Sequence, residues 1–267
     1  MLTRREVIAA TMGTLVAGPA RSLLDAQAGL PDSEMQKGDP QLEYETINYS
    51  AAGIQQLNTQ NNVGTRGTLE QWRADWPKEM LKKARTFVGK TSRVKTPEKI
   101  SEFLELFNLK SKGADGTDVP FCAAGLTYCA LLTYADLVSP GYPVAKRMDT
   151  LRKLAPEIDH YYFYPTVACK SMWFVAQGKS QWKAKQPNLI PRSGWIALFD
   201  WENRVAHEPN HCGIVEAADA MSLSTIEFNT SSTSERNGGA VEAKLRNYNN
   251  VIGYIVTDIK PGAPGTL

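Results

Sequence analysis

Cys122 stands directly after Pro120 and Phe121, where the polar loop "SKGADGTDVP" gives way to the apolar run "CAAGLTYCALLTYADL". Small and apolar residues recur through this run at helical spacing, which predicts a buried helix that begins at Cys122. The unpaired backbone amides at such a helix start favour a thiolate and can donate hydrogen bonds to an oxyanion. A cysteine in this position is still more often a packing residue than a nucleophile, so a catalytic role needs support from elsewhere in the chain.

His211 offers a base for such a thiol. It opens the run "HCGIVE", which residue types and alternation predict as a strand. Alternation places His211 and Gly213 on one face of that strand, and Cys212 and Ile214 on the other. A catalytic thiol needs an imidazole within reach, and the chain contains only three histidines. His211 is therefore the candidate base.

Glu227 and Asn229, on the next predicted strand, are candidates for the group that orients the imidazole. If the turn between the strands centres on Ala220, His211 lies opposite Asn229, and if it centres on Asp219, His211 faces Glu227. Both polar residues have the same parity and share a face, so either can reach the imidazole and fix its tautomer. The sequence leaves the choice between them open.

The remaining cysteines are interpreted as packing residues. Cys129 lies seven residues after Cys122, on nearly the same face of the predicted helix. Cys169 is also expected in the core, with a disulfide to Cys129 or Cys212 as the alternative. Four cysteines are too few for a disulfide-stapled scaffold in a chain of 267 residues.

Zinc is an alternative use of the same residue types. His207, His211, Cys212 and Cys122 would together offer nitrogen and sulfur ligands. Adjacent strand residues point to opposite faces, so we do not expect His211 and Cys212 to bind one ion. We therefore expect no metal and no cofactor.

Helical patterns precede strand patterns along the chain, which predicts an α+β domain over residues 69–260. Pro77 is expected to break or restart the first helix of this domain. The predicted helices cover residues 69–90, 96–110, 122–137 and 166–178, and the predicted strands cover 194–201, 212–219, 223–231 and 250–259, with a further strand allowed between the last two. Residues 29–68 are predicted to be a linker and residues 261–267 a tail.

The N-terminus has the order of features that is typical of a bacterial twin-arginine export signal. Arg4 and Arg5 precede an apolar run over residues 7–17, and Ala26 and Ala28 have the spacing of a cleavage site. The sequence therefore predicts a signal peptide over residues 1–28 and a periplasmic or extracellular protein, with a buried N-terminal helix as the alternative.

Composition narrows the class of protein further. A net charge of +2 gives no case for nucleic acid as a partner. Hydrophobic residues make up 42% of the chain and charged residues 22%, an ordinary globular balance. Beyond the N-terminus no stretch is apolar enough to predict a stable membrane span. The sequence gives no indication of oligomeric state.

Four segments, in their order and spacing, resemble the CHAP family (cysteine- and histidine-dependent amidohydrolases/peptidases). They are "PFCAAGLTYCA", "PRSGWIALFDW", "HCGIVEAADAMSLSTIEFNTS" and "NVIGYIV". The resemblance runs from about residue 69 to 259. It implies a papain-like fold, with N-terminal helices packed on a C-terminal antiparallel sheet. It also implies that Cys122 is the nucleophile, that His211 is the base, and that Glu227 and Asn229 fill the polar positions of the next strand.

The same resemblance implies a function. The family cleaves amide bonds in bacterial peptidoglycan, in the cell-wall peptide or at the sugar–peptide junction, through a thioester intermediate. We weigh this hydrolase against a non-catalytic cell-wall-binding protein on the same fold, and against a thiol-dependent acyl transferase.

Several positions depart from the family pattern. Phe121 stands where tryptophan is common, Cys212 where an apolar residue is common, and Gly194-Trp195 where Gly-Asp is frequent. The stretch 135–187 is longer than in a minimal domain, and we interpret it as an insertion that could shape the substrate groove.

Overall fold

The structure of this chain is a computed structural model that describes residues 69–91, 100–112, 118–161, 163–203, 208–234 and 238–258. The predicted signal peptide (1–28), linker (29–68) and tail (261–267) lie outside these residues, and so does His207.

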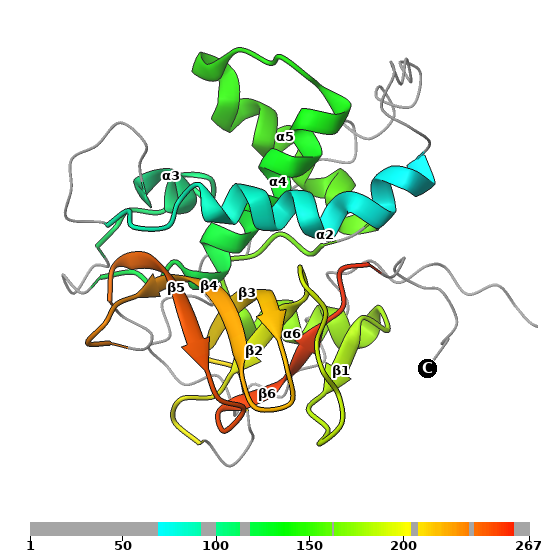
Figure 1. Cartoon of the computed structure of the whole chain (residues 1–267). Helices are drawn as coiled ribbons and strands as arrows, with labels where there is room; N and C mark the ends of the chain where they lie inside the picture. Colours follow the sequence, from blue (N-terminus) through cyan, green and yellow to red (C-terminus); the bar gives the residue numbers. More distant parts are fainter. Residues whose placement is uncertain are drawn as a thin grey trace, which may run out of the picture. The chain divides into compact units, whose positions relative to one another are not determined.

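Helices occupy the first half of the described chain and strands the second half (Figure 1). The α+β class predicted from the sequence is confirmed. The helices are α2 (Leu69–Arg85), α3 (Ile100–Glu105), α4 (Cys122–Val138), the short 3-10 helix η3 (Val144–Lys146), α5 (Arg147–Tyr161) and α6 (Cys169–Gly178). The strands are β1 (Trp182–Ala184), β2 (Ile196–Phe199), β3 (His211–Ala218), β4 (Leu223–Thr230), β5 (Ala240–Arg246) and β6 (Val251–Ile255).

The six strands form one sheet in the order β1-β6-β2-β3-β4-β5, and every neighbouring pair is antiparallel. The four predicted strands are present, and the further strand allowed before the last of them is β5. Strand β1 was not predicted from the sequence, because three residues are too few to show an alternating pattern.

Helix α4 begins at Cys122, as predicted, and its first three turns are almost wholly buried. Gly125 allows this helix to approach the sheet closely, since a Cβ atom there would lie 2.3 Å from the ring of Phe228 on β4. Gly125 also closes the first turn, donating from its amide to the carbonyl of Phe121 at 2.8 Å. The contact between Gly125 and Phe228 thus fixes the start of α4, with Cys122, close to the sheet.

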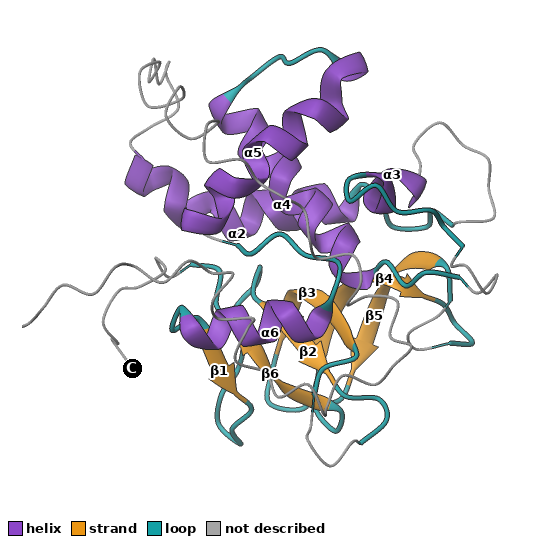
Figure 2. Ribbon diagram, turned by 180° about the vertical axis from the view of Figure 1, so that it is seen from behind, coloured by secondary structure: helices purple, strands orange, loops and turns teal. Residues whose placement is uncertain are grey.

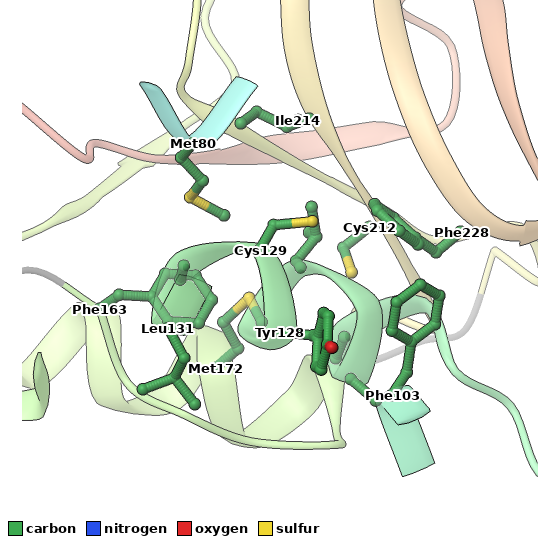
Figure 3. Packing of buried hydrophobic residues seen from close by; sticks show 14 of the residues in the cluster. Met80, Phe103, Tyr128, Cys129, Leu131, Phe163, Met172, Cys212, Ile214 and Phe228 are labelled. Carbon is green, nitrogen blue, oxygen red and sulfur yellow. The ribbon is translucent and has the colours of Figure 1, made fainter. Parts of the chain in front are cut away.

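The two faces of the sheet have separate cores, as strand alternation requires. Cys212, Ile214 and Phe228 belong to the larger core, together with side chains of α2, α4 and α6. Figure 2 shows α6 lying across this face, and Figure 3 shows Cys212 and Phe228 beside Tyr128 of α4. The other face carries a smaller core around Phe199 and Tyr254.

Helix α2 is continuous through Pro77, so the predicted break there is wrong. Proline removes one backbone hydrogen bond and strains a helix interior, but tertiary packing can outweigh that cost. Trp76 and Met80, on either side of Pro77, are completely buried, and Pro77 itself lies against Gly194. Packing on the sheet therefore holds the helix together across the proline.

Residues 135–187 contain the end of α4, then η3, α5, α6 and β1. Helix α5 contacts α4, where Tyr134 donates a hydrogen bond to Glu157 at 2.9 Å. Helix α6 contacts β1 through Trp173 and Trp182, whose rings meet edge to face at 6.1 Å. Among the described residues, no helix has both the length and the hydrophobicity that crossing a bilayer requires.

Candidate active site

Cys122 is the first residue of α4 and is 2% exposed. The residue before it, Phe121, has φ −127° and contributes no side-chain cap to the helix. The first amides of an α-helix have no partner within the helix. The amides around Cys122 therefore add positive potential beside its sulfur and offer donors to a nearby anion.

Two other thiols surround Cys122. Cys169 is the first residue of α6, and its Sγ lies 3.4 Å from Cys122 Sγ. Cys212 is the second residue of β3, and the three sulfur atoms all lie within 4.8 Å of one another. All three cysteines are buried, and none of them forms a disulfide. Two helix starts and one strand thus place three thiols at a single point.

These contacts lower the pKa of Cys122 well below its usual value. The neighbouring thiol of Cys169 contributes most, followed by Cys212, and together with His211 they outweigh the opposing effect of burial. Cys212 behaves in the opposite way, because burial and the other two sulfur atoms raise its pKa well above the usual range. Negative charge in this cluster is therefore concentrated on Cys122.

His211 begins β3 and is completely buried, with its Nε2 atom 3.0 Å from Oε2 of Glu227. Gly213 pairs with Glu227, the register that the turn centred on Ala220 predicts, although a bulge between Val215 and Ala217 shifts the pairing nearer the turn. In this register Glu227 reaches His211 diagonally across the strand pair. The acid that holds the imidazole, which the sequence left open, is Glu227.

Gly213 permits this diagonal contact. A Cβ atom on Gly213 would lie 2.7 Å from Cγ of Glu227 and 3.3 Å from Cβ of Thr225. The Glu227 side chain therefore lies over the bare backbone of Gly213 on its way to His211. A glycine two residues after the histidine is a structural requirement of this pair.

Arg246, the last residue of β5, holds the Glu227 carboxylate from the opposite side. It donates from Nε to Oε1 at 2.8 Å and from Nη2 to Oε2 at 2.6 Å, while Thr225 Oγ1 donates to Oε1 at 2.7 Å. The guanidinium also lies 4.8 Å from the ring centre of Trp201. These bonds and this stacking fix the carboxylate that orients His211.

Burial and charge compete at His211 and Glu227, and charge prevails at both. Burial acts to lower the pKa of His211, but the contacts with Cys122 and Glu227 raise it to about 9. Burial acts to raise the pKa of Glu227, but Arg246 and His211 lower it to about 2. The favoured state is therefore a row of alternating charges: thiolate, imidazolium, carboxylate and guanidinium.

Asn229 is buried at the end of β4, where the pairing with β5 is irregular, and has the left-handed φ of 60°. Its carbonyl accepts a hydrogen bond from Gly238 at 3.2 Å. Its predicted role in orienting His211 stays a prediction. Of the other histidines, His207 and the side chain of His160 lie outside the described part of the chain.

The expectation that His211 and Cys212 do not bind one ion stays a prediction, since the described ligand atoms that lie within 4.8 Å of one another are those of Cys122, Cys169 and Cys212, without His211. The two residues do point to opposite faces, since His211 neighbours Phe199 and Cys212 belongs to the helix-side core. Cys122, however, lies beside the start of β3, where both His211 and Cys212 are close enough to lower the pKa of its thiol. Face alternation separates neighbours along a strand but does not exclude a third group placed beyond its end.

Two residues of the site were missed from the sequence. Cys169 lies 47 positions from its partner Cys122, and no local pattern connects them. Arg246 had a usable signal, because Glu242, Lys244 and Arg246 alternate along β5 and pair with every second residue of β4, namely Glu227, Thr225 and Leu223. That pairing places the basic side chains on the face of Glu227.

Comparison with known proteins adds no relative. Neither a scan against known protein families nor a search of curated protein sequences finds a match to this chain. The assignment of chemistry to these residues therefore depends on their geometry and on the sequence motifs.

Proposed function

We propose that this protein is an exported cysteine amidase or endopeptidase that cleaves amide bonds of peptidoglycan. The observation that carries the proposal is the grouping of Cys122, His211 and Glu227: Glu227 lies 3.0 Å from Nε2 of His211, and His211 is close enough to Cys122 to help lower the pKa of its thiol. A thiol with a lowered pKa, an imidazole beside it and a buried acid behind the imidazole are the parts that nucleophilic thiol catalysis needs. The papain-like arrangement and the export route belong to the same proposal.

The first half of the reaction forms an acyl-enzyme. The Cys122 thiolate attacks the amide carbonyl, and the amides at the start of α4 donate to the oxyanion. The tetrahedral intermediate then collapses, the C–N bond breaks, and the imidazolium of His211 gives its proton to the leaving amine. A thioester on Cys122 and a neutral imidazole result.

The second half releases the acid product. His211 takes a proton from a water molecule, which attacks the thioester, and the Cys122 thiolate leaves as the C–S bond breaks. Glu227 stays ionised throughout and holds the imidazole by its Nε2 side, as Arg246 and Thr225 hold Glu227. Glu227, held by Arg246 and Thr225, thus keeps the imidazole in a fixed orientation during the reaction.

Support for peptidoglycan as the substrate comes from the sequence. The motifs around Cys122 and His211 resemble those of CHAP hydrolases, and the twin-arginine signal predicted over residues 1–28 would bring the enzyme to the cell wall. The longer stretch 135–187 contributes Cys169 to the cluster, so this stretch helps to form the site as well as the fold.

One observation favours a second candidate, a non-catalytic cell-wall-binding protein. Cys122 is 2% exposed and His211 is completely buried, so a substrate carbonyl reaches the sulfur only after covering groups move. A binding protein that catalyses no reaction has no need to expose Cys122 and His211 to a substrate, so their burial is compatible with that role.

Digestion of purified peptidoglycan separates the two candidates. We expect the full chain to release soluble fragments whose masses, measured by mass spectrometry, identify the cleaved amide bond. Cys122→Ala should abolish the release, with a loss of at least about 10³-fold. Cys129→Ala is the matched control, since it removes a buried thiol of the same helix, and it should digest at the wild-type rate.

Two results would contradict the hydrolase. One is a wild-type protein that binds peptidoglycan but releases nothing, which supports the binding protein. The other is Cys122→Ala that digests as fast as Cys129→Ala, which would place the nucleophile elsewhere.

A further inference from the structure

The three thiols around Cys122 have the spacing of a metal site. Zinc–sulfur bonds of about 2.3 Å at tetrahedral angles place ligand sulfur atoms roughly 3.8 Å apart. Here one sulfur pair is 3.4 Å apart and all three atoms lie within 4.8 Å of one another. A cation at the centre of Cys122, Cys169 and Cys212 would need only small side-chain adjustments.

His211 would supply a fourth ligand after a shift of its side chain, because its ring nitrogens do not lie within 4.8 Å of all three sulfur atoms. Its Nε2 is occupied by Glu227, while its Nδ1 is buried and makes no hydrogen bond within the described part of the chain. Because Nε2 contacts the carboxylate of Glu227, Nδ1 is the ring nitrogen available to face Cys122. Metal-bound histidines commonly donate their other N–H to a carboxylate that is itself held in place. Glu227, held by Arg246 and Thr225, meets that description.

The surroundings determine which cation fits. Three sulfur atoms and one nitrogen form a soft set that favours zinc or copper(I) over magnesium or calcium. The starts of α4 and α6 both contribute positive potential at the sulfur atoms, which stabilises thiolate ligands. Because Glu227 is paired with Arg246, its charge is balanced and it acts as a support for His211.

We propose that Cys122, Cys169, Cys212 and Nδ1 of His211 bind a zinc ion. Cys122 binds as the thiolate it already is, Cys169 and Cys212 each give up a thiol proton, and the imidazolium of His211 gives up its Nδ1 proton; these three protons go to solvent, and no electron is transferred. The binding site stands independently of the hydrolase. Its consequence rests on the proposed function: zinc occupies both the nucleophile and the base, so the bound ion inhibits the enzyme reversibly, and removing the ion restores activity.

Cobalt(II) provides a direct test, because its absorption reports ligand type and geometry. The full chain is stripped with a chelator, kept reduced with a phosphine, and titrated with cobalt and then zinc. We expect one cobalt per chain, with intense thiolate-to-cobalt bands and the visible spectrum of a tetrahedral site, both lost when zinc displaces cobalt. A weak octahedral spectrum without thiolate bands would overturn the proposal.

Variants assign the ligands. Cys169→Ser and Cys212→Ser should each weaken zinc binding by at least about 100-fold, since even supporting residues of metal sites are worth 10- to 100-fold. Cys129→Ala, which lies outside the cluster, should bind zinc as the wild type does. Unchanged binding by both serine variants, or equal loss in Cys129→Ala, would overturn the assignment. Circular dichroism checks that each variant is folded.

The metal and the hydrolase can fail separately. A stripped protein that digests peptidoglycan but takes up no cobalt retains the proposed function and refutes the zinc site. A protein that forms the tetrahedral cobalt–thiolate centre but never digests peptidoglycan retains the zinc site and refutes the hydrolase. Intact mass checks that the phosphine keeps the thiols reduced, since a disulfide would lower the mass by two hydrogens.

Discussion

Cys122 and Cys129 lie in the same helix, both are buried, and their chemistry is opposite. The pKa of Cys122 is lowered well below its usual value, while burial raises the pKa of Cys129. Their exposures, 2% and 0%, do not explain the difference. Burial at the start of a helix among polar partners favours a thiolate, and burial two turns later among apolar side chains favours a neutral thiol.

The partners of Cys122 come from two other elements. Cys169 lies at the start of α6, while Cys212 and His211 lie at the start of β3. Behind His211 stands Glu227, and that acid is held by a guanidinium from the edge strand β5. Helix α4 thus supplies the position of the nucleophile, and α6 and the sheet together supply its charge environment.

Among variants that keep the Cys122 thiol, the largest predicted effect follows from removing the charge behind His211. Glu227→Gln leaves the guanidinium of Arg246, 8% exposed, without its ionised partner, and leaves His211 without its acid. Breaking a buried pair from one side costs about 3 kcal/mol of unfolding free energy, and the lost orientation of the base should slow digestion by about 10²- to 10⁴-fold. Urea unfolding and the peptidoglycan digest measure the two effects.

Glu242→Gln is the matched control for Glu227→Gln. Glu242 pairs directly with Glu227 across β4 and β5, but its carboxylate is partly exposed and bonded to Lys244 at 3.0 Å. A partly exposed ion pair contributes less than about 1 kcal/mol, so this variant should unfold and digest nearly as the wild type does. Equal losses in both variants would mean that Glu227 acts only through the sheet's net charge.

A smaller effect is expected from Gly213→Ala, which tests the diagonal path of the Glu227 side chain. The new methyl group would meet Cγ of Glu227 at 2.7 Å and push the carboxylate away from His211. Misplacement of a catalytic support by about 1 Å can cost 10²-fold in rate, so digestion should fall by about that factor. Gly178→Ala, where nothing lies within 4 Å of the added methyl group, should have no effect on rate.

The smallest effect is predicted for Cys129→Ala. Loss of a buried sulfur from the core of α4 should reduce the unfolding free energy by about 1 kcal/mol, through a small cavity, while leaving digestion unchanged. Urea unfolding measures the first quantity and the digest the second. A large loss of activity in this variant would contradict the claim that Cys122 is the nucleophile and Cys129 only a packing residue.

Much of the fold was predictable because its signals are local. The apolar run after Pro120 predicted a helix that begins at Cys122, and alternation around His211 and Glu227 predicted β3 and β4. The prediction at Pro77 failed because a local rule for proline was applied where tertiary packing prevails. The three-residue strand β1 was missed because it has too few residues to carry a pattern.

Only two features of the site could be predicted from the sequence: the order of its residues along the chain, and the strand face on which each residue lies. Parity placed Glu227 and Asn229 on one face, but the choice between them depended on the register of a hairpin that contains a bulge. The contact of Cys169 with Cys122 depends on how α6 packs against α4, which no spacing in the sequence encodes. The most distinctive feature of the cluster is that the thiols of Cys169 and Cys212 lie beside Cys122, and this feature depends on long-range packing.

Competitive alkylation of the native protein tests the central claim most directly. The metal-free, reduced protein is treated with iodoacetamide at neutral pH, and mass spectrometry follows the labelling of Cys122 and Cys129 in the same sample. The account predicts that Cys122 is labelled at least about tenfold faster, because only its sulfur is held as a thiolate. Labelling of Cys122 no faster than Cys129, and only after denaturation, would contradict it.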